Sequence, residues 1–147
     1  MGATNFMTTA KGKSLDDAFR AATDQARFEY GHGGYTGSIA EKDHVMEVRP
    51  PMRVPPGTRK KTYLQAVHIA EAWSWMREDT AEDLKDDRPR YIKRRKQIAK
   101  EVDKFNAKGF DMAYMCDMTN HATKWEPCCG MRLGHSNEYV FWGIASE

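Results

Sequence analysis

The segment from residue 30 to residue 42 holds the densest group of side chains that could bind or react. It reads Tyr-Gly-His-Gly-Gly-Tyr-Thr-Gly-Ser-Ile-Ala-Glu-Lys. Glycine is favoured where the backbone takes positive φ or where another group comes close, so this run predicts a tightly folded loop. Successive backbone N–H groups in such a loop form a concave site for an anion. We interpret the loop as a candidate ligand-binding site made of Tyr30, His32, Gly33, Gly34, Tyr35, Thr36 and Lys42.

In such a site Tyr30 or Tyr35 would stack on a base, and Lys42 would meet the negative charge. Phosphate loops of the Walker and Rossmann types lead from a strand into a helix, whose N-terminus faces the phosphate. Here the loop leads out of a predicted helix into a predicted strand, so no helix dipole would help. A purely structural turn is therefore the alternative interpretation.

Acid–base catalysis is a second chemistry that this loop could support. A histidine titrates near neutral pH, and a neighbouring carboxylate can orient it, so His32 could act with Glu41 or Thr36. The spacing gives none of the geometry that catalysis needs. We therefore assign no catalytic residue, expect no cofactor, and favour a binding protein over an enzyme.

The last third of the chain holds the side-chain types that zinc prefers, namely Cys116, His121, Cys128, Cys129 and His135. A Cys-x-x-Cys pair is missing, and adjacent cysteines in a strand point to opposite faces. Free cysteine is also common in protein cores. These residues stay candidates only, and no metal is assigned.

A basic run follows an acidic one in the middle of the chain. Lysine and arginine on one side of a predicted helix could bind the phosphates of nucleic acid, through Arg90, Lys93, Arg94, Lys96, Lys100 and Lys104. No recognition motif accompanies them. A solvated helix face, or one that docks on an acidic surface, is the alternative.

The N-terminal third contains the elements that must position the loop. Residues 4–10 are rich in threonine and predict a strand. Ser14 is typical of a helix N-cap, and a helix is predicted from Leu15 to a stop at Gly31. Residues 35–39 alternate and predict a strand, which would pair with residues 44–48 across a turn.

The middle of the chain predicts two more helices. Thr62 and Gln65 form a capping box, and residues 63–76 predict a largely buried helix, with a buried strand over residues 63–66 as the alternative. Asp87 would cap a third helix, with Pro89 in its first turn. That helix would end at Gly109.

The rest of the sequence predicts strands. In residues 110–117 the apolar Phe110, Met112, Tyr114 and Cys116 occupy every second position, which predicts a strand, and residues 131–133 and 139–145 could form a hairpin. The last of these is apolar on both faces, so it should be a central strand. The order predicts an α+β fold, a mainly antiparallel sheet packed against about three helices.

Length and composition set the broad class. A chain of 147 residues fits a single domain, residues 1–147, and its prolines make residues 49–57 a stiff internal connection. Three cysteines favour a reducing compartment. The apolar runs are too short for a membrane helix, and no signal peptide is apparent. We therefore expect a cytoplasmic protein without a membrane partner, and the sequence leaves its oligomeric state open.

Two stretches resemble small accessory proteins of tailed phages and prophages. They are the N-terminal run through Gly-Tyr-Thr-Gly-Ser-Ile-Ala-Glu-Lys, and the end, Lys-Trp-Glu-Pro through Tyr-Val-Phe-Trp-Gly-Ile-Ala-Ser. The resemblance implies a protein that acts in a host cell by blocking a host or defence factor, or by sequestering a small anionic ligand such as a nucleotide. A virion component is a further alternative. The resemblance carries no site residues.

Overall fold

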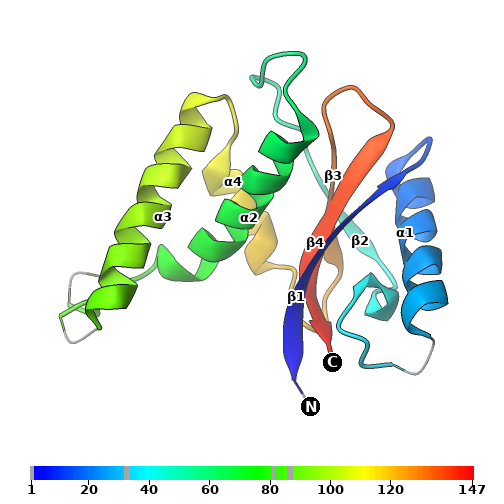
Figure 1. Ribbon diagram of the computed structural model, residues 1–147, viewed down its shortest axis with the longest axis horizontal. Helices are drawn as coiled ribbons and strands as arrows, with labels where there is room; N and C mark the ends of the chain where they lie inside the picture. Colours follow the sequence, from blue (N-terminus) through cyan, green and yellow to red (C-terminus); the bar gives the residue numbers. More distant parts are fainter. Residues whose placement is uncertain (1, 32–33, 81, 86–87) are drawn as a thin grey trace. The chain divides into compact units, whose positions relative to one another are not determined.

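The structure is a computed structural model that describes residues 2–31, 34–80, 82–85 and 88–147. Its elements follow in the order β1 (Ala3–Lys11), α1 (Leu15–Tyr30), a 3₁₀ helix (Ile39–Glu41), β2 (Val45–Val48), α2 (Lys60–Met76), α3 (Pro89–Ala107), α4 (Met112–Asn120), β3 (Cys128–Arg132) and β4 (Glu138–Ser146) (Figure 1). A four-stranded, mostly antiparallel sheet combined with four helices confirms the predicted α+β class.

The chain divides into two compact units. Unit 1 comprises Met1–Pro50 and His121–Glu147 and holds the sheet with α1, whereas unit 2, Pro51–Asn120, holds α2, α3 and α4. The first boundary between them falls within the predicted proline-rich connection, residues 49–57. The description of the whole chain as a single domain stays a prediction.

The sheet of unit 1 has the strand order β1-β4-β3-β2. Strand β4 pairs antiparallel with β1, from Ala3↔Ser146 to Lys11↔Glu138, and antiparallel with β3 on its other side. The predicted hairpin near the end of the chain and the predicted central position of its last strand are both confirmed. Val140, Phe141 and Trp142 are fully buried, as a strand that is apolar on both faces requires.

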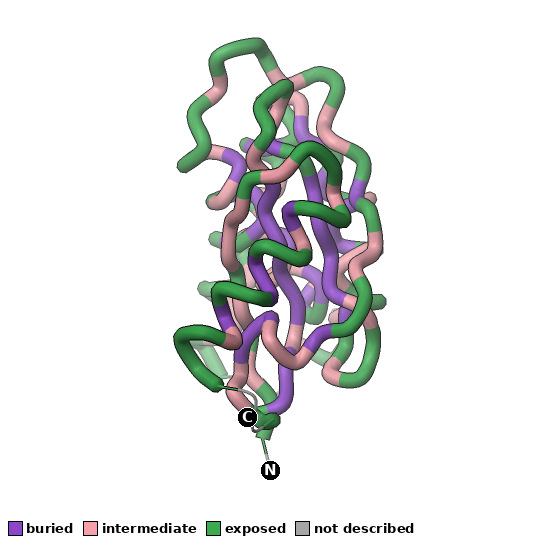
Figure 2. Tube along the Cα trace, turned by 90° about the vertical axis from the view of Figure 1, so that its right-hand side faces the viewer, coloured by how far each residue is buried: buried purple, intermediate pink, exposed green. Residues whose placement is uncertain are grey.

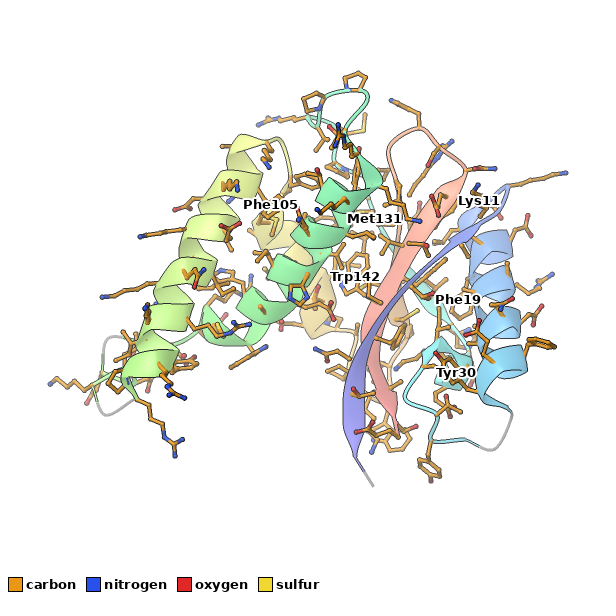
Figure 3. All side chains as sticks on the ribbon, in the orientation of Figure 1. Lys11, Phe19, Tyr30, Phe105, Met131 and Trp142 are labelled. Atoms are coloured by element: carbon orange, nitrogen blue, oxygen red, sulfur yellow. The ribbon has the colours of Figure 1, made fainter. Side chains whose placement is uncertain are left out.

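Helix α1 covers one face of this sheet and matches its prediction. The Ser14 hydroxyl accepts the Asp17 N–H at 3.2 Å, and Gly31 follows the last helical residue with φ of +87°. Ala18, Ala22 and Ala26 are buried, and the Phe19 ring, which points from the helix toward the sheet (Figure 3), lies 5.9 Å from the Phe141 ring. In Figure 2, where α1 faces the viewer, its outer side is exposed and the strands behind it are buried.

The strand predicted at residues 35–39 is wrong. Gly34 and Tyr35 both take positive φ, at +75° and +57°, which breaks an extended chain. Ser38 then caps the 3₁₀ helix by accepting the Ala40 N–H at 3.2 Å. The predicted strand at 44–48 exists as β2, but it pairs with β3 in parallel, with Val45 opposite Cys128, and not with residues 35–39.

The predicted strand at residues 110–117 is also wrong, because α4 begins at Met112. The Asn106 side-chain oxygen accepts the Met112 N–H at 3.0 Å, and that of Asp111 accepts the Tyr114 N–H at 3.1 Å. Both bonds satisfy N–H groups of the first helical turn. Met112, Met115 and Cys116 are buried at helical spacing, so the apolar residues that suggested a strand fit a helix equally well.

The other two helices of unit 2 confirm their predictions with one change. Helix α2 starts at Lys60 after Arg59, which makes no side-chain cap, so the predicted capping box at Thr62 lies inside the first turn. Helix α3 has Pro89 in its first turn, and its predicted cap Asp87 lies outside the described residues. Gly109 follows α3 with φ of +104°, and a Cβ there would lie 2.4 Å from the Arg53 carbonyl oxygen. A side chain at this position would therefore collide with the backbone.

Within the described ranges, no helix is both long enough and apolar enough to cross a bilayer.

Candidate functional site

The glycine loop is partly described, and the donors of Tyr35 and Thr36 are already paired. His32 and Gly33 lie outside the described residues. The Glu41 carboxylate accepts the Tyr35 N–H at 3.0 Å, the Thr36 N–H at 3.2 Å and the Thr36 hydroxyl at 2.6 Å. Two successive N–H groups of the loop thus converge on one carboxylate. A carboxylate of the protein itself occupies the place of the expected anion.

Lys42 points its charge into the protein. Its side chain is 3% exposed, and its ammonium donates to the carbonyl oxygens of Thr123 at 2.9 Å, Lys124 at 3.0 Å and Glu126 at 2.7 Å. Burial lowers the pKa of this amine below its ordinary value, against smaller opposite effects of Cys128 and Glu126. Lys42 therefore fastens the loop to the segment that leads into β3, and its donors are used there.

The glycines of this loop serve different purposes. Gly31 terminates α1, and a Cβ there would meet nothing within 4 Å. Gly37 lies against β1, where a Cβ would come within 2.8 Å of the Thr4 methyl group, and its N–H donates to the Ser146 carbonyl at 2.7 Å. Close packing against the sheet explains Gly37, and helix termination explains Gly31.

An open groove of about 550 Å³ runs beside this loop, between α1 and β1. Residues 6–10 of β1 line one side, residues 36–39 close one end, and α1 supplies the other side through Ala21, Ala22, Gln25, Ala26, Glu29 and Tyr30. Because alanine side chains are small, this side of α1 leaves room beside the strand. A second groove, of about 590 Å³, lies at the start of α1 beside β2 and includes the charged residues Asp16, Glu47 and Arg132.

Large aromatic side chains stand in solvent near the end of α1. Phe28 is 87% exposed, Tyr30 60% and Tyr35 49%. Tyr30 also lines the groove beside β1, and Figure 3 shows it at the end of the helix. Of the predicted ligand-binding residues, Tyr30 and Thr36 line the groove, and Gly34 and Tyr35 directly precede Thr36 in the chain. The Lys42 ammonium is bonded to residues 123–126 instead. Phe28 and strand β1 were not among the predicted site residues. The absence of proline from residues 3–11 was the available signal for an open strand edge.

The six predicted nucleic-acid-binding residues, Arg90, Lys93, Arg94, Lys96, Lys100 and Lys104, are all exposed along α3. Across the described part of the chain, no ion pair engages any of them. Arg95 differs, because its guanidinium donates to the carbonyls of Met76 and Asp79, each at 3.1 Å, and lies over the Trp73 ring. Arg95 thus ties α3 to the end of α2, while its neighbours remain in solvent.

The candidate metal ligands, to which no metal was assigned, are divided between the two units. Cys116 lies in α4 of unit 2, where its thiol donates to the Ala70 carbonyl at 3.6 Å. Cys128 belongs to the core cluster between α1 and the sheet, and Cys129 is its neighbour in β3. Burial raises the pKa of Cys116 to about 11 and that of Cys128 to about 12. His121 and His135 are exposed, and the described residues contain no group of three potential ligands close enough for a metal ion.

Comparisons with protein-family models, with curated proteins and with solved structures found no match to this chain.

Proposed function

We propose that this chain is a non-enzymatic binding protein that acts by occupying a surface of a partner protein. The observation that carries the proposal is the exposed aromatic side chain of Tyr30, which lines the open groove between α1 and β1, with the exposed Phe28 and Tyr35 near it in the sequence. Aromatic residues are enriched in the buried centres of protein interfaces, where they contribute much of the binding energy. The resemblance to phage accessory proteins suggests a host protein as this partner.

The internal contacts of the loop favour a protein partner over a small anion. An anion would compete with Glu41 for the Tyr35 and Thr36 N–H groups, and Lys42 would have to leave three carbonyl oxygens to reach it. Both changes would leave buried or half-buried polar groups unpaired, which costs free energy. Covering the exposed tyrosines with a partner, by contrast, costs little free energy, because it breaks none of these internal hydrogen bonds.

The test is capture of partner proteins by the purified full chain from an extract of cells that naturally express it, measured by quantitative mass spectrometry. Replacing Phe28 and Tyr30 together with serine should reduce the captured partner at least about tenfold, because aromatic anchors often contribute 2 kcal/mol or more. The matched control is Trp125→Ser, which removes a side chain of the same unit that is 76% exposed. Equal capture by all three proteins would contradict the proposal. Small molecules released on heating, measured in parallel, would instead support an anionic ligand.

Nucleic-acid binding by α3 is the second candidate function. The observation in its favour is the row of six exposed basic residues described above, which lack ion-pair partners within the described chain. Binding of a DNA or RNA duplex should weaken steeply as salt increases, because each phosphate contact releases counterions. Reversing the charge with Lys96→Glu and Lys100→Glu should lower the slope of log affinity against log salt by about 2. Salt-independent binding, or none, would exclude this candidate.

A further inference from the structure

Strand β1 lies at the edge of the sheet, and among the described strands it pairs with β4 alone. At its two ends, the Glu147 N–H donates to the Gly2 carbonyl at 3.2 Å and the Gly12 N–H donates to the Asn137 carbonyl at 2.9 Å. The register between these contacts is unbroken. Hydrogen-bonded and non-hydrogen-bonded pairs alternate in an antiparallel ladder. The backbone N–H and C=O groups of the even-numbered residues of β1 therefore point toward β4. The odd-numbered residues, Ala3, Asn5, Met7, Thr9 and Lys11, direct their N–H and C=O groups to the other side.

No strand pairs with that other side within the described part of the chain. Natural sheets usually protect such an edge by a short strand, a proline, a bulge or charged side chains. Strand β1 has nine residues, no proline and no bulge, and its charged residue is Lys11 at the end. The opposite edge of the sheet is β2, which has four residues and is soon followed by Pro50 and Pro51. Among the strands that the structure describes, only β1 therefore offers a long edge that pairs with no other strand.

The groove between α1 and β1 lies beside this edge. Side chains of a strand alternate between the two faces of a sheet, so every second side chain of a strand added to β1 would point toward the α1 side. The groove there holds about 550 Å³ and is lined by Phe6, by the small side chains Ala21, Ala22 and Ala26, and by Tyr30 at one end. Its one acidic group is Glu29. These features suit apolar side chains, with a basic residue preferred over an acidic one near Glu29.

We propose that an extended segment of the partner protein adds to the free edge of β1 as a further strand and places alternate apolar side chains in the groove beside α1. The inference rests on the proposed function and names its mode of recognition. Backbone hydrogen bonds to the odd-numbered residues of β1 supply affinity that does not depend on sequence. The groove supplies selectivity, as in other cases where a peptide extends a sheet next to a helix.

The occupant is a partner segment and not a second copy of this chain. In a second copy, the β1 side chains on the α1 side belong to its own core, since Phe6 and Ala10 pack against the buried cluster of Ala18, Ala22 and Phe141. A β1–β1 pair would therefore bring backbone to the edge but no free side chain for the groove. A flexible segment of another protein brings both.

The first experiment selects peptides from a displayed library of random ten-residue peptides on the immobilised full chain, and measures their affinity by fluorescence anisotropy. Met7→Pro removes an outward N–H group of β1 without touching the ladder to β4, while Met7→Ala removes the same side chain and keeps the N–H. The selected peptides should bind Met7→Pro at least about tenfold more weakly than Met7→Ala, because adjacent backbone bonds are lost together. A second pair tests the groove. Gln25→Trp should fill it and weaken binding, whereas Asp24→Trp, exposed on α1 outside the groove lining, should not.

Amide hydrogen exchange keeps the inference testable even if Met7→Pro fails to fold. In the wild-type chain, bound peptide should slow exchange at Asn5, Met7 and Thr9, whereas the even-numbered amides, already bonded to β4, should change little. Asn5→Pro, nearer the start of the strand, provides a milder substitution with the same purpose.

Several results would overturn the inference. These are failure to select any peptide, equal affinity of Met7→Pro and Met7→Ala, unchanged exchange at the odd-numbered amides, or a wild-type dimer that Met7→Pro converts to a monomer. If Met7→Pro still captures the cellular partner while the Phe28 and Tyr30 variant does not, the inference fails and the proposed function stands. If the wild type captures no protein but the selected peptides bind β1, the proposed function fails and the edge remains a strand-binding site.

Discussion

Lys42 shows how the same residue type can serve a ligand or the fold. The segment around it has the composition of an anion-binding loop, but its ammonium is buried and bonded to the carbonyls of Thr123, Lys124 and Glu126. Of these three oxygens, that of Thr123 also accepts the Glu126 N–H at 3.2 Å. We therefore expect Lys42 to contribute to stability and not to recognition.

Lys42→Met should lower the free energy of unfolding by about 3 kcal/mol, because hydrogen bonds from a charged donor are lost and carbonyl groups are left unpaired. Urea unfolding followed by circular dichroism measures the change. The control is Lys13→Met, at an exposed position, which should stay within about 0.5 kcal/mol of the wild type. Equal stability of the two variants would show that the three carbonyl contacts contribute nothing.

Glu71 of α2 should make stability depend on pH. Burial raises the pKa of its carboxyl group from 4.5 to about 7 in the folded protein. Between these values the folded state holds a proton that the unfolded state releases, so the stability from Glu71 is complete below about pH 4.5 and is lost as the pH rises through 7. Between pH 5 and pH 8 the free energy of unfolding of the wild type should fall by on the order of 2 kcal/mol because of Glu71, and Glu71→Gln should abolish this fall. Unfolding curves across this range measure it, with Glu82→Gln at an exposed position as the control. Parallel pH profiles of wild type and Glu71→Gln would contradict the prediction.

At the level of elements, α1 depends on its first turn. The Ser14 hydroxyl accepts the Asp17 N–H, and the alanines of the helix pack against the sheet. Ser14→Ala should destabilise the protein by about 1 kcal/mol, whereas Ser14→Asp, which keeps an acceptor, should cost a few tenths. Thermal unfolding of the three proteins tests this. A loss of equal size in both variants would mean that the hydroxyl does not act as a cap.

The elements that local patterns predicted well are those with a clear start, stop or period. Ser14 and Gly31 bracket α1, and the double-sided apolar run of β4 indicated a central strand. The segment from residue 110 failed because Met112 and Cys116 satisfy both a period of two and helical spacing, so only the caps at Asn106 and Asp111 distinguish the two. Residues 35–39 failed because positive φ at Tyr35, a residue with a side chain, has no strong signal in sequence.

The candidate site was predicted less completely than the elements. The loop was recognised by its glycines, and its tyrosines are exposed near the groove. That Glu41 would occupy the loop, and that Lys42 would turn inward, depends on contacts with residues 123–126 far along the chain. The free edge of β1 likewise becomes evident only after residues 3–11 are known to pair with residues 138–146. Local sequence cannot show pairing over such a separation.

At the level of the whole molecule, the cysteines allow side-chain burial to be tested in both units. Cys116 of unit 2 and Cys128 of unit 1 are buried, and burial raises the pKa of each thiol well above 9. Because the thiolate is the reactive form, iodoacetamide at about pH 8 should label the native protein at least ~10²-fold more slowly than the urea-unfolded protein. Gln97→Cys, at an exposed position of α3, provides the accessible comparison. Native labelling of Cys116 or Cys128 as fast as that of this control would contradict the buried placement.

The central position of β4 has a consequence for synthesis of the protein. Both β1 and β3 need β4 as their antiparallel neighbour, and β4 follows every other element in the chain. A ribosome therefore releases β1 well before its partner β4, with all of unit 2 translated in between. During elongation both edges of the nascent β1 are unpaired. Until the sheet forms, this strand can therefore bind chaperones or aggregate. Assembly of the sheet must be a late event that follows translation of β4.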